Sequence, residues 1–340
     1  MSDFRIVPGF EDVWRPPAGR RRTPETVLGH SSGSPQDVRA RLARVVRKAP
    51  EVMVKVTGRT RNPAHLRAHL DYISRNGQIE LEAADGARLA SRDEVRDVGD
   101  DWSFAALADS RRRANSPLSL SIILSMPADT DPLKLSDAAR AFAAGAFEDR
   151  FDYVFALHTD TAHPHVHLTV ACRGVGGERL NPKKADLEAW RQLFAECLRD
   201  RGVEAEATPR RARGVTRKAE RGPVRRQRER WQAGGPAGRV RRAAYQSAAL
   251  NAFGAAGSPE PWKAPIVRRQ QRVRTLYLAQ ARLLLTTGEA EDAALALALE
   301  SFVAGMPAPE TQRDRLAREL SEAGRTSDRA DGAAGRDRTR

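Results

Sequence analysis

Four of the seven histidines in this 340-residue chain lie in one ten-residue string, HTDTAHPHVH, from His158 to His167. Alternating apolar residues predict two strands here, over 153–159 and 164–172, joined by a short turn. His165 and His167 are two residues apart on the second strand, so their side chains point to the same face of the sheet. If the first strand ends at His158, that imidazole reaches the same face. Three converging imidazoles predict a facial metal site with open positions for a substrate.

Asp160 lies between the two strands, and two roles are open to it. Its carboxylate accepts hydrogen bonds only, so it could hold one imidazole in the ligating tautomer, or it could contact the metal itself. We expect His163, which directly precedes Pro164, to be an ordinary turn residue.

Two alternatives compete with this metal site. One is a histidine-rich surface turn that binds metal incidentally. The other is a histidine-triad nucleotide hydrolase or transferase, in which the middle residue of His163, His165 and His167 is the nucleophile and no metal is needed. Pro164 in an apolar slot and the upstream His158-x-Asp160 sequence argue against a triad hydrolase.

A tyrosine is the second candidate for chemistry. Asn62 and Pro63 predict the start of a helix, and Tyr72 shares one face of that helix with His69. A metal with open positions beside a basic patch suggests phosphate chemistry, for which water is the default nucleophile. A phenol, with an ordinary pKa of about 10, attacks poorly until a base or a cation lowers the cost of its phenolate. Candidate bases are His69 and Asp160, and the metal alone could also suffice.

The remaining elements must hold these side chains together. From residue 52 the pattern predicts a strand (52–58), a helix (63–75), a hairpin (79–86), a helix (93–113), a strand with one buried face (118–126), a helix (135–147), the two histidine strands and a helix (187–202). Adjacent strands without crossover helices favour an α+β fold, with a central antiparallel or mixed sheet and helices on one face.

The distribution of charge along the sequence indicates further segments of the chain. The 58 basic and 44 acidic side chains give a net charge of +14, and 14 basic against 4 acidic residues fall between Arg201 and Arg242. Such a patch predicts a polyanionic partner. The expected segments are a mostly disordered basic arm (1–50), a catalytic core (51–205), an Arg-rich linker or DNA-contacting segment (206–265), a helical region (266–325) and a disordered tail (326–340).

Two features that the sequence lacks indicate the cellular compartment. No apolar run approaches the roughly 20 residues that cross a bilayer, and the two cysteines, Cys172 and Cys197, are too few for a disulfide framework. We expect a soluble protein in a reducing compartment, without stable membrane insertion.

Three strings in this order resemble the motifs of one enzyme family: LDYISRNGQIEL, ILSMPADT and HTDTAHPHVHLTV. They look like the three motifs of the conjugative and mobilisation relaxases of the MobA/VirD type, which are HUH (His, hydrophobic, His) endonucleases. The similarity is greatest to the branch that includes the T-DNA border endonuclease of plant-transforming bacteria. RRARGVTRK, over 210–218, resembles the segment that closes the relaxase core. The resemblance covers about residues 50–218 and implies a relaxase/Rep-like core.

The resemblance also implies roles for individual residues. Tyr72 matches the transesterifying tyrosine, Ser125 matches a serine in contact with DNA, and Asp160 matches the acidic residue beside the first histidine. The implied metal triad is His158, His165 and His167. Three imidazoles alone would suggest zinc, whereas the family implies Mg²⁺ or Mn²⁺. DNA contacts are expected at Arg75, Arg210, Arg211 and Arg213.

The implied activity is nicking of one DNA strand at an origin of transfer, through a 5′-phosphotyrosyl adduct that can be religated. The implied partners are single-stranded or supercoiled origin DNA, relaxosome accessory proteins and a type IV secretion coupling protein. The implied location is the bacterial cytoplasm, from which the protein could be translocated with the strand. Ala171, where the family commonly has Asn, and the long arm before Val52 depart from the pattern. The main alternative is a non-catalytic DNA-binding accessory protein.

Overall fold

The computed structural model describes residues 4–14, 35–147, 149–216, 222–235, 239–252 and 260–322. The chain divides into two compact units. One is continuous and runs from Pro16 to Thr208. The other combines Met1–Arg15 with Pro209–Arg340.

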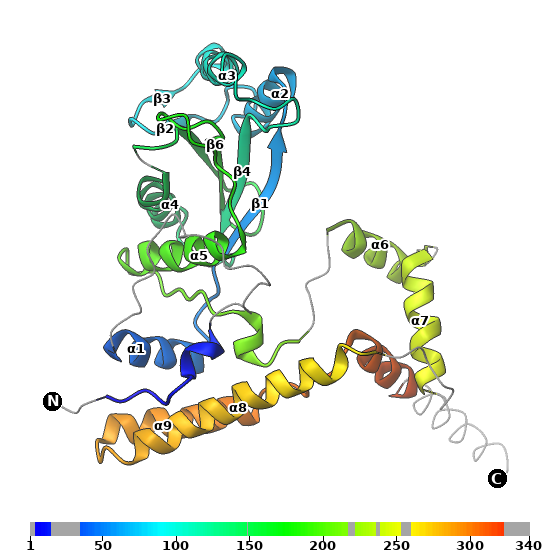
Figure 1. The fold of residues 1–340 in the computed structure, drawn as a ribbon. Helices are drawn as coiled ribbons and strands as arrows, with labels where there is room; N and C mark the ends of the chain where they lie inside the picture. Colours follow the sequence, from blue (N-terminus) through cyan, green and yellow to red (C-terminus); the bar gives the residue numbers. More distant parts are fainter. Residues whose placement is uncertain are drawn as a thin grey trace, which may run out of the picture. The chain divides into compact units, whose positions relative to one another are not determined.

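The continuous unit is built on a six-stranded sheet in which all paired strands are antiparallel (Figure 1). The strand order is β1-β4-β6-β5-β2-β3. The strands are β1 (Met53–Thr60), β2 (Leu81–Ala83), β3 (Arg88–Leu89), β4 (Ser119–Ser125), β5 (Tyr153–His158) and β6 (His165–Ala171). The helices are α1 (Pro35–Val46), α2 (Pro63–Ile73), α3 (Arg92–Leu107), α4 (Pro132–Phe147) and α5 (Lys184–Arg199). The predicted α+β class and antiparallel sheet are confirmed.

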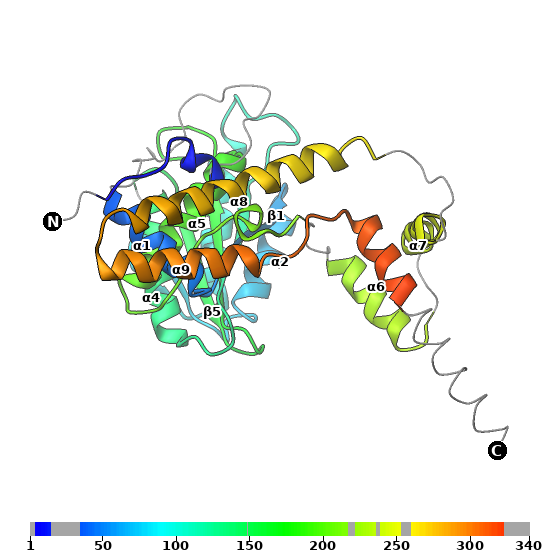
Figure 2. The ribbon, with the colours of Figure 1, turned by 90° about the horizontal axis from the view of Figure 1, so that it is seen from below.

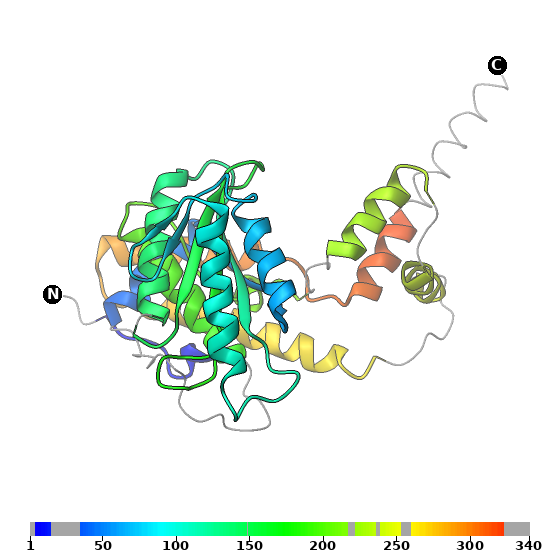
Figure 3. The same cartoon turned by 90° about the horizontal axis from the view of Figure 1, so that it is seen from above.

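Helices cover both faces of the sheet, so the expectation of helices on one face is wrong. α4 and α5 pack on one face, through the cluster that contains Phe142, Phe194 and Leu168. α2 and α3 pack on the other face, through the cluster that contains Leu70 and Trp102, and they lie in front of the sheet in Figure 3. Helices α2 and α3 each have an apolar face that must be buried, just as α4 and α5 do.

Strand β4 is buried on both of its faces because helices cover both faces of the sheet. Leu120, Ile122 and Leu124 enter the core beneath α4 and α5, as their alternation predicts. Ser119 and Ser121 are also buried, because the helices on the other face cover them. The prediction of a single buried face for this strand is therefore wrong, and short hydroxyl side chains occupy its second face.

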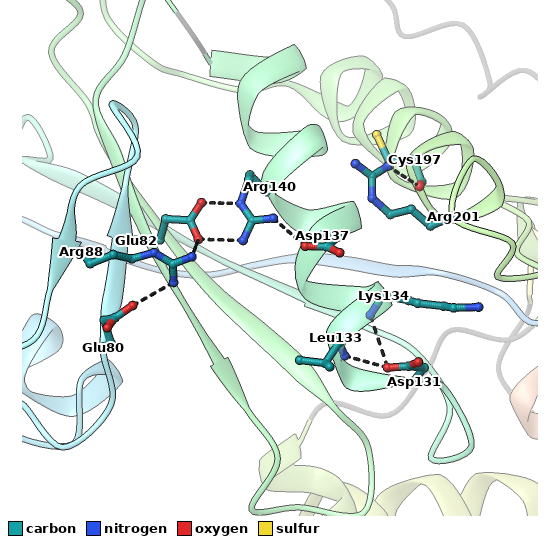
Figure 4. Close-up of polar contacts among 10 residues, drawn as sticks. All are labelled: Glu80, Glu82, Arg88, Asp131, Leu133, Lys134, Asp137, Arg140, Cys197 and Arg201. Carbon is teal, nitrogen blue, oxygen red and sulfur yellow. Dashed lines mark hydrogen bonds and ion pairs between the residues drawn. The ribbon is translucent and has the colours of Figure 1, made fainter.

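A buried carboxylate ties the edge hairpin to α4 (Figure 4). Glu82 on β2 makes a two-point ion pair with the Arg140 guanidinium, whose Nη2 lies 2.8 Å from Glu82 Oε2. Arg88 on β3 reaches the same carboxylate at 3.2 Å and also binds Glu80 at 2.8 Å. Asp137, one turn before Arg140 on α4, completes the group. The hairpin that follows α2 is thus held by charge as well as by strand pairing.

The discontinuous unit is helical in its described residues. Its elements are η1 (Phe10–Val13), η2 (Arg210–Arg213), α6 (Gly222–Gln232), α7 (Arg239–Ala252), α8 (Lys263–Leu285), α9 (Ala290–Ala304) and a helix over 312–322. α8 and α9 lie side by side (Figures 1 and 2). The described parts of the Arg-rich 206–265 segment are largely helical.

The N-terminal segment belongs to this helical unit. Gln280 on α8 holds its backbone, accepting from Val7 N at 2.9 Å and donating to Arg5 O at 2.9 Å. Phe10 packs edge-on against Tyr277, with centroids 5.5 Å apart. Within the arm over 1–50 that was expected to be mostly disordered, residues 4–14 and α1 are ordered. At 4–14, buried aromatic contacts offset the entropy of ordering. Residues 15–34 and the expected tail at 326–340 lie outside the described residues.

None of the helices in the described ranges combines the length and the hydrophobicity needed to cross a lipid bilayer.

Candidate functional site

Helix α2 has a defined start and a defined end. Asn62 Oδ1 accepts from the His65 backbone N–H at 2.8 Å, and Pro63 occupies the first turn, as the sequence predicts. Beyond Ile73, Arg75 and Asn76 adopt left-handed φ values of 53° and 57°. Gly77 follows at φ +84°, where a Cβ would lie 2.7 Å from the Arg92 backbone nitrogen. Only glycine fits at that last position, and the tight turn directs Arg75 back toward the helix.

The three predicted histidines come together. β5 and β6 pair in a register that places His158 opposite His165, and His167 follows on the same face of β6. Each ring offers a nitrogen within 4.8 Å of the nitrogens offered by the other two. The ring centroids of His158 and His167 are 4.5 Å apart. These residues, His158, His165 and His167, form what we call the histidine cluster.

Hydrogen bonds fix the tautomers of two of these rings. His158 Nε2 lies 2.7 Å from the Ile73 carbonyl oxygen, and a carbonyl only accepts, so this nitrogen carries the hydrogen. Its Nδ1 is buried and has no hydrogen-bond partner in the described residues. His165 Nδ1 likewise donates to the His163 carbonyl at 3.1 Å, so Nε2 is the nitrogen of this ring that remains for a metal. An unpartnered buried lone pair and an oriented imidazole suit a metal ion.

Burial keeps His158 and His167 neutral. Burial is the largest cause that lowers the pKa of His167, to about 3, and the neighbouring His158 and His165 lower it further. The pKa of His158 is also lowered, mainly by burial. Metals bind the unprotonated imidazole, so both rings are in the ligating form at neutral pH.

Tyr72 lies next to this cluster. Its ring stands edge-on to that of His167, with centroids 5.7 Å apart and an interplanar angle of 90°. The side chain remains 54% exposed, which is high for a large ring on a packed helix. The Arg75 guanidinium lies 5.6 Å from the Tyr72 centroid. The predicted tyrosine and the predicted metal site are thus one site.

Asp160 takes a role that the sequence did not predict. Its carboxylate, 52% exposed, forms an ion pair with Arg75, and it is not a member of the ligand cluster. The pairing of Arg75 with both Tyr72 and Asp160 depends on the left-handed turn at Arg75, for which the sequence carries no local signal.

His69, one turn before Tyr72, is engaged with the sheet. Its Nε2 lies 2.9 Å from Ser121 Oγ on β4 and 2.9 Å from Thr169 Oγ1 on β6. Burial is the main cause that lowers the pKa of His69 to about 4, and His65 adds to it. Sequence reasoning missed Ser121 and Thr169, although the serine alternation along β4 already indicated a polar face.

The other expected contacts are distributed over both units. Ser125 is buried opposite His165, and its hydroxyl donates to the Pro164 carbonyl at 3.2 Å. The three arginines of η2 belong to the helical unit. Arg210 is exposed, whereas the Arg211 guanidinium donates to the Trp14 carbonyl and its own carbonyl accepts from Gln270 at 3.1 Å. Arg213 is half-buried.

Known proteins resemble part of this chain. Residues 72–203 match the family model described as "Relaxase: MobA/VirD2-like, nuclease domain". The T-DNA border endonuclease VirD2 of Rhizobium radiobacter is 29% identical over 185 residues, which are 48% of this chain and 43% of that protein. The T-DNA border endonuclease VirD2 of Agrobacterium fabrum is 28% identical over 186 residues, covering 49% and 41%. The chain thus spans less than half the length of these relatives.

Two solved structures show a weaker likeness. The MobM relaxase domain bound to a 26-nucleotide pMV158 oriT DNA is 13% identical, with a TM-score of 0.37, over 50% of this chain and 95% of that one. A Mn-bound MobM relaxase domain with pMV158 oriT DNA is 12% identical, with a TM-score of 0.38, over 52% and 98%.

Proposed function

We propose that this chain, whose residues 72–203 match the MobA/VirD2-like relaxase nuclease domain, nicks one DNA strand at an origin of transfer with Tyr72 as nucleophile. The nick leaves a 5′-phosphotyrosyl strand and a free 3′-hydroxyl. Religation is the same reaction in reverse. The activity serves conjugative transfer or mobilisation in the bacterial cytoplasm.

One observation carries the proposal. The half-exposed ring of Tyr72 lies directly against His167, within a cluster of three imidazoles whose nitrogens lie within 4.8 Å of one another. A nucleophile positioned beside a group that can bind a phosphate oxygen is the arrangement that phosphoryl transfer requires. A histidine-rich surface turn would not account for buried rings, a buried lone pair and a tyrosine in contact.

The residues present suit a divalent metal. The residues that would hold Mn²⁺ or Mg²⁺ are His158, His165 and His167. The phosphate of the DNA would supply the hard oxygen ligands that these ions prefer. Bound there, the ion would supply Lewis-acid stabilisation of the charge that develops on the scissile phosphate.

The chain's own residues carry the remaining steps. The Arg75 guanidinium lies beside the Tyr72 ring, and Asp160 holds that guanidinium in place. His69 is occupied by its two hydroxyl partners, so the phenolic proton passes to solvent. The Tyr72 oxygen then forms a bond to phosphorus as the bond from phosphorus to the 3′ oxygen breaks, and that oxygen takes a proton to become a hydroxyl. One phosphodiester replaces another, so rejoining needs no ATP.

The proposed substrate is the single-stranded or supercoiled DNA of the transfer origin, with Arg75 and Arg210 as backbone contacts. Ser125, another expected contact, is buried and its hydroxyl donates to the Pro164 carbonyl. The proposed protein partners are relaxosome accessory proteins and a type IV secretion coupling protein, as the family resemblance implies.

A covalent capture experiment tests the activity. The full chain is incubated with a random single-stranded DNA library and Mn²⁺, boiled in detergent, and the DNA that stays attached is sequenced. We expect one enriched sequence joined through its 5′ phosphate to Tyr72, and no capture when EDTA is added. Capture at another residue, or capture that is indifferent to EDTA, would contradict the proposal; EDTA indifference is what a histidine-triad enzyme would show.

A further inference from the structure

Helix α2, which carries Tyr72, is attached to the sheet by polar contacts on both sides of that residue. On the C-terminal side, His158 Nε2 donates to the Ile73 carbonyl at 2.7 Å. On the N-terminal side, His69 Nε2 lies 2.9 Å from Ser121 Oγ and from Thr169 Oγ1. Tyr72 therefore sits between two attachments that both lead to strands of the histidine cluster.

Helix α2 lies along β6 so that its two residues His69 and Tyr72 contact two successive residues on one face of the strand. His69 and Tyr72 are one helical turn apart, about 4.5 Å along the axis, and Thr169 and His167 are two residues apart, about 6.7 Å along the strand. His69 bonds Thr169, and Tyr72 contacts His167. Each helix residue thus meets one residue on the same face of β6, and the first contact sets the second.

The His69 contact has little freedom to rearrange. Thr169 is 0% and Ser121 is 4% exposed, and the two residues are paired across β4 and β6. A single nitrogen with one hydrogen or one lone pair serves both hydroxyls. If His69 is removed, two buried hydroxyls lose their partner, and a buried hydroxyl without a partner is costly.

We propose that His69 is a positioning residue, which through Ser121 and Thr169 sets the distance of Tyr72 from the histidine cluster. This inference rests on the proposed function for its catalytic consequence, but its structural part is testable alone. A displacement of about 1 Å at a reacting group is enough to lower a rate on the order of 100-fold.

The variants are His69→Ala, His69→Gln and, as a matched control, His65→Ala. His65 lies on the same helix, one turn earlier, and is exposed. In His69→Gln, the amide can still hydrogen-bond a hydroxyl. The first measurement is hydrogen exchange of the α2 backbone amides in the full chain, without DNA or metal. We expect exchange about tenfold faster in His69→Ala, and unchanged rates in His65→Ala.

The second measurement is the rate of adduct formation on the oligonucleotide that the wild-type chain selects, together with titration of Mn²⁺ alone. We expect a loss of roughly 10- to 100-fold in rate for His69→Ala, with Mn²⁺ affinity within about threefold of wild type, and recovery of most of the rate in His69→Gln.

Three outcomes would overturn the inference: His69→Ala matching His65→Ala in both measurements, Mn²⁺ affinity falling as far as the rate, or His69→Gln failing to recover either quantity. If the wild-type chain forms no adduct at all, the proposed function fails, and hydrogen exchange alone decides whether His69 fixes α2.

A pair of hydroxyl variants separates the two partners. Because one nitrogen serves both, Ser121→Ala and Thr169→Val should each have a small effect on exchange, and the double variant should approach His69→Ala. Additive, equally small effects in the double variant would contradict a shared contact.

Discussion

The ring of Tyr72 stands perpendicular to the ring of His167, with centroids 5.7 Å apart. The two residues are 95 positions apart in the chain, and they meet because α2 lies along the face of β6 that carries the histidines. A helix that begins at a well-capped residue and ends in a tight turn thus delivers one side chain to one strand. The catalytic consequences can be tested residue by residue.

Tyr72→Phe should abolish the covalent DNA adduct, by at least about 1000-fold, since the ring remains but the nucleophilic oxygen is gone. Binding of DNA and of Mn²⁺ should be unchanged, because the edge-on contact with His167 needs only the ring. Detergent-resistant adducts on a gel report the loss. Tyr245→Phe, in α7 of the helical unit, is the control, and adduct formation by Tyr72→Phe at the control's rate would refute the nucleophile assignment.

His167→Ala should lose Mn²⁺ binding by about 100-fold or more, because it removes one of three converging ligands. His163→Ala is the matched control: it changes an exposed histidine four residues away whose contribution here is a backbone carbonyl. Calorimetric titration with Mn²⁺ measures both. Equal affinities in the two variants would mean that the cluster is not the metal site.

Acid should destabilise the metal-free chain through His69. Its pKa is lowered from 6.5 to about 4 by burial and by His65, so the unfolded chain takes up the proton at a higher pH than the folded chain. Stability is therefore lost as pH falls from about 6.5 toward 4, by about 2 kcal/mol at pH 5 from this group. His69→Gln lacks this loss. Urea unfolding at pH 7.5 and pH 5 in EDTA should show wild type losing more stability than His69→Gln; parallel losses would contradict the shift.

Arg140→Ala should destabilise the continuous unit by about 1–3 kcal/mol, because it leaves the buried Glu82 carboxylate with Arg88 as its remaining partner (Figure 4). Replacing both members, as Glu82→Met with Arg140→Met, should recover much of the loss. Arg67→Ala breaks an exposed ion pair with Asp100 and should have little effect. Thermal unfolding compares the three. A double variant less stable than Arg140→Ala would show that the loss does not come from an unpaired buried charge.

Arg210 and Arg211 should behave differently despite being neighbours. Arg210 is exposed, so Arg210→Ala should weaken DNA binding and reduce the slope of log affinity against log salt by about 1. Arg211 donates to the Trp14 carbonyl, so Arg211→Ala should mainly lower the stability of the helical unit. Binding titrations at several salt concentrations, with thermal unfolding alongside, distinguish the two. An unchanged salt slope in Arg210→Ala would remove it from the DNA interface.

Local patterns predicted the parts of the site that depend on neighbouring residues. The two-residue spacing of His165 and His167, and the short turn after His158, were enough to predict three imidazoles on one face. The N-cap at Asn62 and the helix that carries Tyr72 were equally local.

Contacts between distant elements were not predictable in this way. The ion pair of Arg75 and Asp160 spans 85 positions and needs a left-handed turn at an arginine, which a sequence pattern does not signal. The bonds from His69 to Ser121 and Thr169 require that α2 cover the sheet, whereas the sequence suggested helices on one face. The hold of Gln280 on residues 5–7 joins α8 to the N-terminal segment, where composition suggested disorder.

The first described element of the continuous unit, α1, lies beside the segment that ends this unit. Arg41 on α1 donates to the Ala207 carbonyl at 3.1 Å, Arg44 pairs with Glu206 at 2.9 Å, and Val52 N bonds Glu206 O at 2.9 Å. A domain whose entry and exit lie side by side can sit within another as an insertion. The helical unit, which contains segments from before and after it, is the host in this arrangement. The continuous unit thus interrupts the helical unit in the sequence, while the flanking segments remain in contact through the bond from Arg211 to the Trp14 carbonyl.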